Sequence, residues 1–215
     1  IWLGMVATIV CLLIGYPVAY IIAKTSNTSQ KTMILLIMMP MWMNFLLRTY
    51  AWMTLLEDTG IINNILAFIG LPRVRLINTE GAIVLGMVYN FLPYMILPLY
   101  TALSKMDTSL VEAAQDLGCN KWYCLRKVIF PLSVPGIASG VTMVFVPSVS
   151  TFYITQKLGG GQITLIGDVI EGQFQIAYNY NLGAALSLVL MVMILICLGV
   201  LNYFTDSDDD GGVLI

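Results

Sequence analysis

The 215-residue sequence contains no histidine and few charged side chains. Only 10% of its residues are Asp, Glu, Lys or Arg, whereas soluble domains carry about 25%. The lack of histidine excludes Ser-His-Asp and Cys-His catalytic sites and histidine-ligated metals. The net charge of −2 offers no basic surface, so no nucleic-acid partner is expected. Because 59% of the residues are hydrophobic, the composition predicts a polytopic protein of the lipid bilayer.

Runs with few or no charges predict five membrane-spanning helices and therefore an all-α fold, because a spanning helix needs about 20 mostly apolar residues. The predicted spans are 1–23, 32–56, 81–104, 128–156 and 182–204. The first run lacks the charged start and the cleavage site of a signal peptide, so it is predicted to be a retained span.

The loops between these spans differ in basic residues, which predicts the orientation of the chain. Loops 24–31 and 105–127 together hold six Lys or Arg residues, whereas loops 57–80 and 157–171 hold three. The more basic loops are expected in the cytoplasm, with the start of the chain outside and its acidic end inside. Within the second loop, segment 61–70 has an amphipathic pattern and predicts a short helix at the membrane surface.

The third loop contains signals for two short helices. Ser109 and Glu112 have the spacing of a capping box, and Gly118 is a natural helix terminator. Asn120 is expected to cap a second helix that runs into the fourth span. Small and apolar side chains are predicted to form one face of the first helix: Leu110, Ala113, Ala114 and Leu117. A helix resting on the bilayer surface is the alternative interpretation.

The same loop resembles a known family motif. Glu112-Ala113-Ala114, three residues, Gly118, nine residues and then Val128–Pro131 resembles the EAA motif of ABC importer permeases. Two positions depart conservatively, with Val where Ile is usual and Phe where Leu is usual. The chain is therefore identified as a member of this permease family.

The resemblance implies a type I ABC importer permease fold in a bacterial inner membrane. It implies a transmembrane permease domain at 1–205 with a cytoplasmic coupling loop at 105–131. The acidic C-terminal tail at 206–215 matches no pattern of this family. The resemblance also implies that a dimer of ABC ATPase subunits docks on the coupling residues Glu112, Ala113, Ala114, Gly118 and Pro131. The chain has no GxxxxGK[ST] pattern. ATP and Mg²⁺ are thus expected on the partner, and this chain is expected to be no enzyme and to hold no cofactor or metal.

Further segments resemble one branch of the family, the permease subunits of spermidine/putrescine importers. These segments are 13–17, 40–44, 47–50, 88–93, 152–153, 159–160 and 165–174. The resemblance implies a polyamine substrate, an extracytoplasmic substrate-binding protein and a second permease subunit. Such permeases have six spans, so Ile1 is expected to correspond to the second.

A flexible polycation needs carboxylates for its ammonium groups and aromatic faces for cation–π contact. On this basis the predicted pathway residues are Trp42, Asn44, Tyr50, Trp52, Tyr89, Tyr94, Ser150, Tyr153, Asp168 and Glu171. Interfacial anchoring by aromatic residues and ordinary loop charges are the alternative for each of them. The polar run 148–151 is expected to face the pathway, and prolines are expected to break or kink the spans at Pro40, Pro93, Pro98 and Pro147.

Arg48 is the one charge inside a long apolar stretch. A structural role is expected, through pairing with Glu57 or with a partner subunit. If the substrate were an anion, Arg48 would become a ligand. A related ABC importer for an anion or another small solute, such as sulfate, iron or thiamin, is therefore the alternative. A stand-alone secondary transporter is disfavoured because the chain has no histidine and no mid-span acid. A structural membrane protein without a pathway leaves the EAA spacing unexplained.

Overall fold

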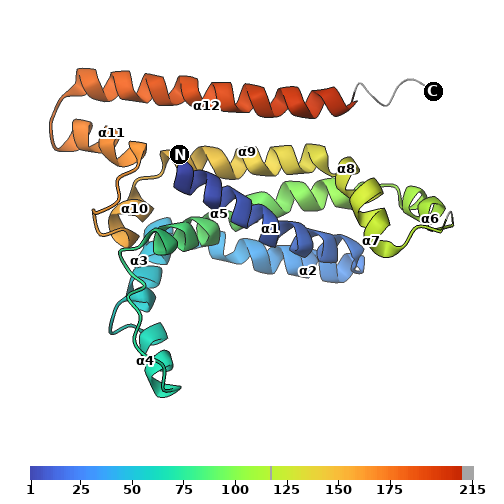
Figure 1. The fold of residues 1–215 in the computed structure, drawn as a ribbon, viewed down its shortest axis with the longest axis horizontal. Coiled ribbons are helices and arrows are strands. Elements are labelled where there is room, and N and C mark those ends of the chain that lie inside the picture. Colours follow the sequence, from blue (N-terminus) through green and yellow to red (C-terminus); the bar gives the residue numbers. More distant parts are fainter. Residues whose placement is uncertain (117, 210–215) are drawn as a thin grey trace.

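The computed structural model describes residues 1–116 and 118–209, and every regular element in those two ranges is helical. The all-α prediction is confirmed. The long helices lie alongside one another and form a bundle (Figure 1). They are α1 (Trp2–Lys24), α2 (Asn27–Met38), α5 (Glu80–Ser104), α9 (Val134–Ser150) and α12 (Tyr180–Asp209).

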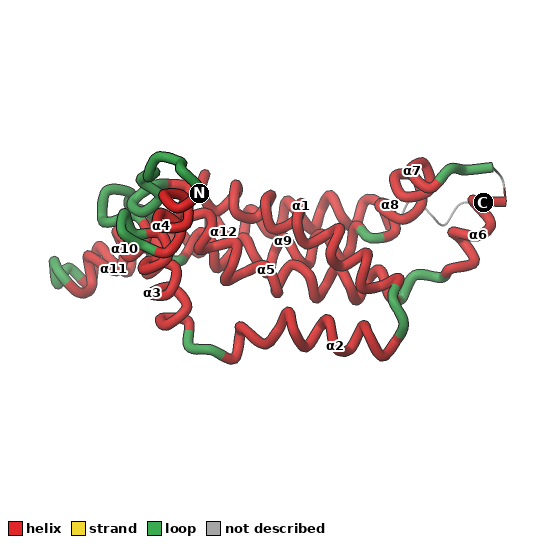
Figure 2. The backbone as a smooth tube through the Cα atoms, turned by 90° about the horizontal axis from the view of Figure 1, so that it is seen from below, coloured by secondary structure: helices red, strands yellow, loops and turns green. Residues whose placement is uncertain are grey.

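Short helices lie at both ends of this bundle. One end, called the inner end below, carries α6 (Thr108–Asp116), α7 (Lys121–Cys124), the π-helical turn η2 (Leu125–Ile129) and α8 (Phe130–Leu132). The opposite, outer end carries α3 (Phe45–Leu56), α4 (Ile61–Phe68), α10 (Tyr153–Leu158) and α11 (Ile166–Gln175). The connection from α1 to α2 also lies at the inner end (Figure 2). The predicted alternation of loops between two sides is therefore confirmed.

Close helix packing at the centre of the bundle depends on small residues. Helices α1, α5 and α9 contact one another, and α5 carries the fully buried Met95. A Cβ atom built on Gly140 would lie 2.7 Å from the Met95 sulfur, and one built on Gly136 would lie 2.5 Å from the Ala102 Cβ. Both glycines face α5 with small-xxx-small spacing, which lets two backbones approach inside a membrane.

Among the described residues, three helices are long and apolar enough to cross a membrane, and the number rises to five if two bent helix pairs each count as one span. Of these three helices, α12 is the least buried, with 11% of its apolar stretch inside the molecule. Large apolar side chains such as Leu13, Leu36 and Leu195 are exposed on the outer surface of the bundle. A bilayer solvates such a surface, as the composition predicts.

The second predicted span, 32–56, is not one continuous helix, so this prediction is wrong. The segments Asn27–Trp42 and Phe45–Phe68 are bent by 89°, so α3 turns away from the bundle. Pro40 lies in the first turn of η1 (Met39–Trp42), which ends α2, and Asn44 caps α3 by accepting a hydrogen bond from the Leu46 amide at 2.8 Å. Proline and an N-cap residue in sequence favour a new helix direction over continuation.

The fourth predicted span is also shorter than expected. Helix α9 ends at Ser150, so the segment from Tyr153 onward belongs to the outer end. Pro93 and Pro98 lie within α5, and Pro147 within α9, without ending these helices. Of the four prolines predicted to break or kink spans, only Pro40 stands at a helix break.

The remaining expectations concern the chain end and segment 61–70. The fifth span is confirmed, and its helix extends to Asp209, so the predicted tail 206–215 begins as helix and then continues outside the described residues. All four cysteines are free: Cys11, Cys119, Cys124 and Cys197. Helix α4 confirms the short helix predicted within 61–70.

Candidate functional sites at the two ends of the bundle

The first helix of the inner end, α6, begins two residues earlier than a cap at Ser109 would allow. The carboxylate of Asp107 accepts a hydrogen bond from the Ser109 amide at 2.9 Å, so Asp107 supplies the cap of α6. This hydrogen bond lowers the pKa of Asp107, because it favours the ionised carboxylate. The capping box predicted for Ser109 and Glu112 is therefore wrong. A negative side chain at the start of a helix also matches the helix dipole.

Gly118 ends α6 as predicted. Its φ of +84° lies in the left-handed region, and the Cys119 amide donates a hydrogen bond to the Ala114 carbonyl at 3.2 Å. This six-to-one bond is the signature of a Schellman motif, which favours glycine at this position. Asn120 then accepts a hydrogen bond from the Tyr123 amide at 2.8 Å and caps α7, which confirms the second predicted cap.

The two faces of α6 divide differently from the prediction. Val111 and Ala114 are half-buried and pack against the core, whereas Leu110, Glu112 and Ala113 are exposed. Ala114 therefore lies on the inward face, not on one exposed face with Leu110 and Ala113, and the Leu117 side chain lies outside the described residues. The exposed surface of α6 therefore includes the Glu112 carboxylate beside two apolar side chains.

The segment that follows α6 is packed into the core of the bundle. Cys124 and Ile129 are almost fully buried in the same hydrophobic core as α1, α5 and α9. Pro131 is exposed in the first turn of α8, where its missing N–H costs no helical hydrogen bond. The exposed face of α6 is thus presented by a segment that is packed into the bundle.

At the outer end, aromatic rings from α3 and α10 meet. The Tyr153 ring lies 5.9 Å from Phe45 and 6.3 Å from Tyr50, both centroid to centroid. The Lys157 ammonium lies 5.4 Å from the Tyr50 ring and 5.8 Å from the Tyr153 ring. These distances are within the range of cation–π attraction. The two tyrosines therefore already hold one ammonium group, which belongs to the chain itself.

Four other predicted pathway residues lie apart from this tyrosine pair. Trp52 and Tyr89 form an edge-to-face contact at 5.3 Å between α3 and α5. Trp42 is 76% exposed and Tyr94 is 40% exposed, and neither makes an aromatic contact within the part of the chain that the structure describes. The predicted set is therefore dispersed over the outer half of the molecule and does not converge on one cavity.

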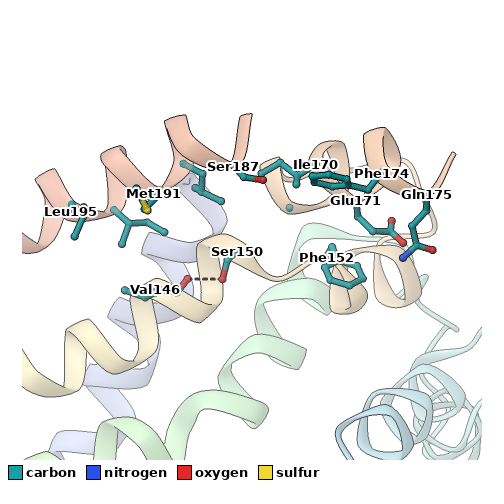
Figure 3. A pocket seen from close by; sticks show the side chains of 13 residues that line it. Val146, Ser150, Phe152, Ile170, Glu171, Phe174, Gln175, Ser187, Met191 and Leu195 are labelled. Carbon is teal, nitrogen blue, oxygen red and sulfur yellow. Dashed lines mark hydrogen bonds between the residues drawn. The ribbon is translucent and has the colours of Figure 1, made fainter. Parts of the chain in front are cut away.

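A groove of about 660 Å³ separates α12 from α9 and α11 at this end. Figure 3 shows Ser150, Phe152, Glu171 and Phe174 around it. The Glu171 carboxylate accepts a hydrogen bond from the Gln156 side chain at 2.7 Å. Ser150 and Glu171, two of the predicted pathway residues, lie at this one groove, whereas the predicted polar run 148–151 does not face one side as a whole. Ser148 is fully buried, and its hydroxyl donates to the carbonyl one turn earlier in α9.

Asp168 has a structural task at the start of α11. One carboxylate oxygen accepts a hydrogen bond from the Leu165 amide at 2.7 Å, and the other is buried without a partner among the described residues. Burial raises the pKa of Asp168, and the nearby charge of Glu171 acts in the same direction. A carboxylate in this environment caps a helix and is at the same time poised to gain a proton or a cation.

Arg48 lies on α3 and is only 9% exposed. Its Nε and Nη1 atoms are buried without hydrogen-bond partners within residues 1–116 and 118–209. In those ranges no ion pair joins Arg48 to Glu57, so the predicted pairing between them is wrong. A buried guanidinium with free donors requires a partner group or water, since its desolvation is costly.

Comparison with known proteins identifies the family. Residues 12–207 match the family described as binding-protein-dependent transport system inner membrane component. The chain belongs to this family. The spermidine/putrescine transport system permease protein PotB of Haemophilus influenzae is 42% identical over 183 residues, which are 84% of this chain and 64% of that protein. PotB of Escherichia coli K12 is 36% identical over 85% of this chain and 67% of that protein. The chain thus spans about two thirds of the length of these relatives.

Solved structures show the same fold at low identity. A bacterial ABC transporter involved in the import of the acidic polysaccharide alginate has a chain that superposes with a TM-score of 0.72. That chain is 19% identical, and the superposition covers 96% of this chain and 78% of that one. The type I ABC permease fold that the resemblance implies is therefore confirmed. The expected inner-membrane location is confirmed by the family, whose description names an inner membrane component.

Sequence reasoning missed three residues that shape these sites. Lys157 was treated as a loop charge, although it follows Tyr153 by four residues, the spacing that places two side chains on one helix face. Asp107 was missed as a cap, although an acidic residue two positions before Ser109 is a recognisable start signal. Phe45 had no comparable signal, because its contact with Tyr153 joins helices that are more than a hundred residues apart.

Proposed function

We propose that this chain is a pathway-forming permease subunit of an ATP-driven importer for polyamines of the spermidine/putrescine class. The observation that carries the proposal is the tyrosine pair, Tyr50 and Tyr153, which surrounds the Lys157 ammonium. The likeness to spermidine/putrescine permeases at 42% identity supports the same substrate class. A primary ammonium on a methylene stem is the chemistry that both Lys157 and a polyamine present.

The outer end also supplies negative charge for a second ammonium group. Glu171 lines the groove between α9, α11 and α12, and Phe152 and Phe174 add apolar faces for methylene groups. Asp168 lies one turn earlier on α11. Separate sites for cationic and methylene parts suit a long flexible substrate better than a compact one.

The energy for transport is proposed to come from partner subunits. The exposed face of α6, with Leu110, Glu112 and Ala113, is the surface on which an ATPase dimer docks. ATP and Mg²⁺ are bound by that partner, and this chain contributes no catalytic residue or cofactor of its own. A second permease subunit and an extracytoplasmic binding protein complete the assembly. Support comes from the motif spacing and from the family, whose description names binding-protein-dependent transport.

An anion importer is the second candidate, and Arg48 is the observation that favours it. Its buried donors without partners have the chemistry of an anion ligand. The tyrosine pair and Glu171 favour a cationic substrate. Because these three groups stand against Arg48 alone, the polyamine is the first candidate. Uptake competition separates the two candidates.

The test uses the full importer in proteoliposomes with ATP on the cytoplasmic side. The proposal predicts saturable uptake of labelled spermidine or putrescine that excess sulfate and thiamin leave unchanged. ATP-driven uptake of sulfate or thiamin without polyamine uptake would overturn the proposed substrate. Uptake that does not require the ATPase subunit would overturn the energy source.

A further inference from the structure

The fourth span contains an elbow at Ser133. The segments Trp122–Leu132 and Val134–Ser150 are bent by 65° at this residue. Pro135 follows two residues later and has no N–H to donate to the carbonyl of Pro131, so the helix cannot continue unchanged. The backbone of Ser133, with φ −92° and ψ −3°, lies outside the centre of the helical region. The bend therefore has a local cause, but proline alone does not set its angle.

A chain of hydrogen bonds joins this elbow to the first span. The Ser133 hydroxyl donates to the Phe130 carbonyl at 2.8 Å. The Tyr16 hydroxyl lies 3.1 Å from the same Ser133 oxygen. Serine has a single hydroxyl hydrogen, so Tyr16 donates this second bond. Ser133 is fully buried, and the Tyr16 ring also lies 5.8 Å from the Phe130 ring.

Both sides of this contact are held by packing. On α1, a Cβ atom built on Gly15 would lie 3.0 Å from the Met95 side chain, so the backbone next to Tyr16 is pressed against α5. On the inner side of the elbow, Cys124 and Ile129 are buried in the core. The Tyr16–Ser133 hydrogen bond therefore joins a rigid span to the point where α8 meets α9.

We propose that Tyr16 is a positioning residue that holds the elbow angle at Ser133. Displacement of α6 and α7 by a partner is then passed to α9 and α1 together, instead of being absorbed by bending at Ser133. Without the hydrogen bond, the elbow bends and part of the displacement is lost. This inference rests on the proposed function, because it describes how a movement that a partner causes at α6 reaches the membrane-spanning helices.

The test compares Tyr16→Phe with Tyr100→Phe in the full importer. Each substitution removes one phenolic hydroxyl and keeps the ring; Tyr100 donates to Gln30 at 3.0 Å, away from the elbow. Tyr16→Phe is expected to raise the ATP hydrolysed per polyamine imported about fivefold, the shift that one lost hydrogen bond gives. The maximal uptake rate falls while the half-saturation constant stays the same. Tyr100→Phe is expected to leave the ratio unchanged.

Ser133→Ala removes the same contact from the other side. It also removes the bond to the Phe130 carbonyl. Its effect on the ratio is therefore expected to be at least that of Tyr16→Phe, and the double variant is expected to match Ser133→Ala alone, because the Tyr16 contact is already lost in that variant. An unchanged ratio in Tyr16→Phe, an equal change in Tyr100→Phe, or additive effects in the double variant would overturn the inference.

A second measurement does not depend on transport. Amide hydrogen exchange of residues 130–137, in the full chain in nanodiscs, is expected to speed up in Tyr16→Phe and not in Tyr100→Phe. Unchanged exchange in Tyr16→Phe would contradict the proposal that Tyr16 holds the elbow at Ser133. If the wild-type importer shows no ATP-driven polyamine uptake but the exchange difference is present, the proposed function fails and the positioning role of Tyr16 stands.

Discussion

The inner and outer ends of the bundle reach defined geometry by different means. At the inner end, Asp107, Gly118 and Asn120 start and stop two short helices through bonds to near neighbours in sequence. At the outer end, side chains from α3, α9, α10 and α11 meet after long excursions of the chain. The first end is a local structure presented by the core, and the second is an assembly of distant segments. Substitutions should therefore separate the two ends.

The largest effect is expected from reversing the charge on the exposed face of α6. Glu112→Lys should reduce ATP-driven uptake by at least about tenfold and release the ATPase subunit, because like charges across a docked surface repel strongly. Asp58→Lys is the matched control, an exposed reversal at the outer end. Co-purification of the ATPase measures the effect, and full retention of the ATPase by Glu112→Lys would contradict it.

Removing an aromatic face at the outer end should act on substrate affinity and leave assembly intact. Tyr50→Ala is expected to raise the half-saturation constant for polyamine about 2- to 30-fold, the range of a cation–π contact. Tyr50→Phe keeps the ring and should stay close to wild type. Uptake at varied polyamine concentration measures both, and equal effects of Ala and Phe would assign the role to the hydroxyl.

Lys157 should compete with the substrate for the same rings. Lys157→Gln removes the resident ammonium and is expected to lower the half-saturation constant about two- to fivefold, a gain limited by the exposure of the site. Lys157→Arg keeps a cation over the rings and should resemble wild type. A raised constant in Lys157→Gln would mean that the lysine helps to build the site.

The smallest effect is expected from the pH dependence of Asp168. Because its pKa is raised in the folded chain, the folded state binds this proton more strongly than the unfolded state. Lowering the pH through the raised pKa should therefore stabilise α11, and the gain disappears as the pH rises again. Hydrogen exchange of the α11 amides measures this dependence. Asp168→Asn should flatten it, and an unchanged slope in that variant would point to another group.

The difference between the two ends also explains what the sequence could predict. The stop at Gly118 and the cap at Asn120 follow from residue types at fixed spacing, so both were predictable. The contact between Phe45 and Tyr153 depends on the turn after Pro40, which sends α3 out of the bundle. Hydrophobicity cannot reveal such a turn, because both sides of it are apolar.

Burial was the second limit. Arg48 stood out in the sequence, but only packing shows that its Nε and Nη1 atoms lack partners among the described residues. Ser148 and Ser150 look alike in sequence, yet one is buried and the other lines a groove. The two serines are only two residues apart on α9. That separation is smaller than the error of any helix boundary predicted from apolar runs.

Two glycines with the same positive φ test the division between the ends most directly. Gly118 at the inner end and Gly70 at the outer end both have φ of +84°, and a Cβ atom on either would meet nothing within 4 Å. Valine at either position therefore imposes the same backbone strain, about 1–3 kcal/mol, without a clash. Only Gly118 ends the helix that is proposed to meet the ATPase.

The decisive measurement is ATP-driven polyamine uptake by Gly118→Val and Gly70→Val importers, at equal amounts of inserted protein. Gly118→Val is expected to lose uptake by about tenfold or more, because α6 cannot end in its Schellman motif. Gly70→Val is expected to retain most of the wild-type rate. Equal uptake by the two variants would contradict the assignment of coupling to the inner end.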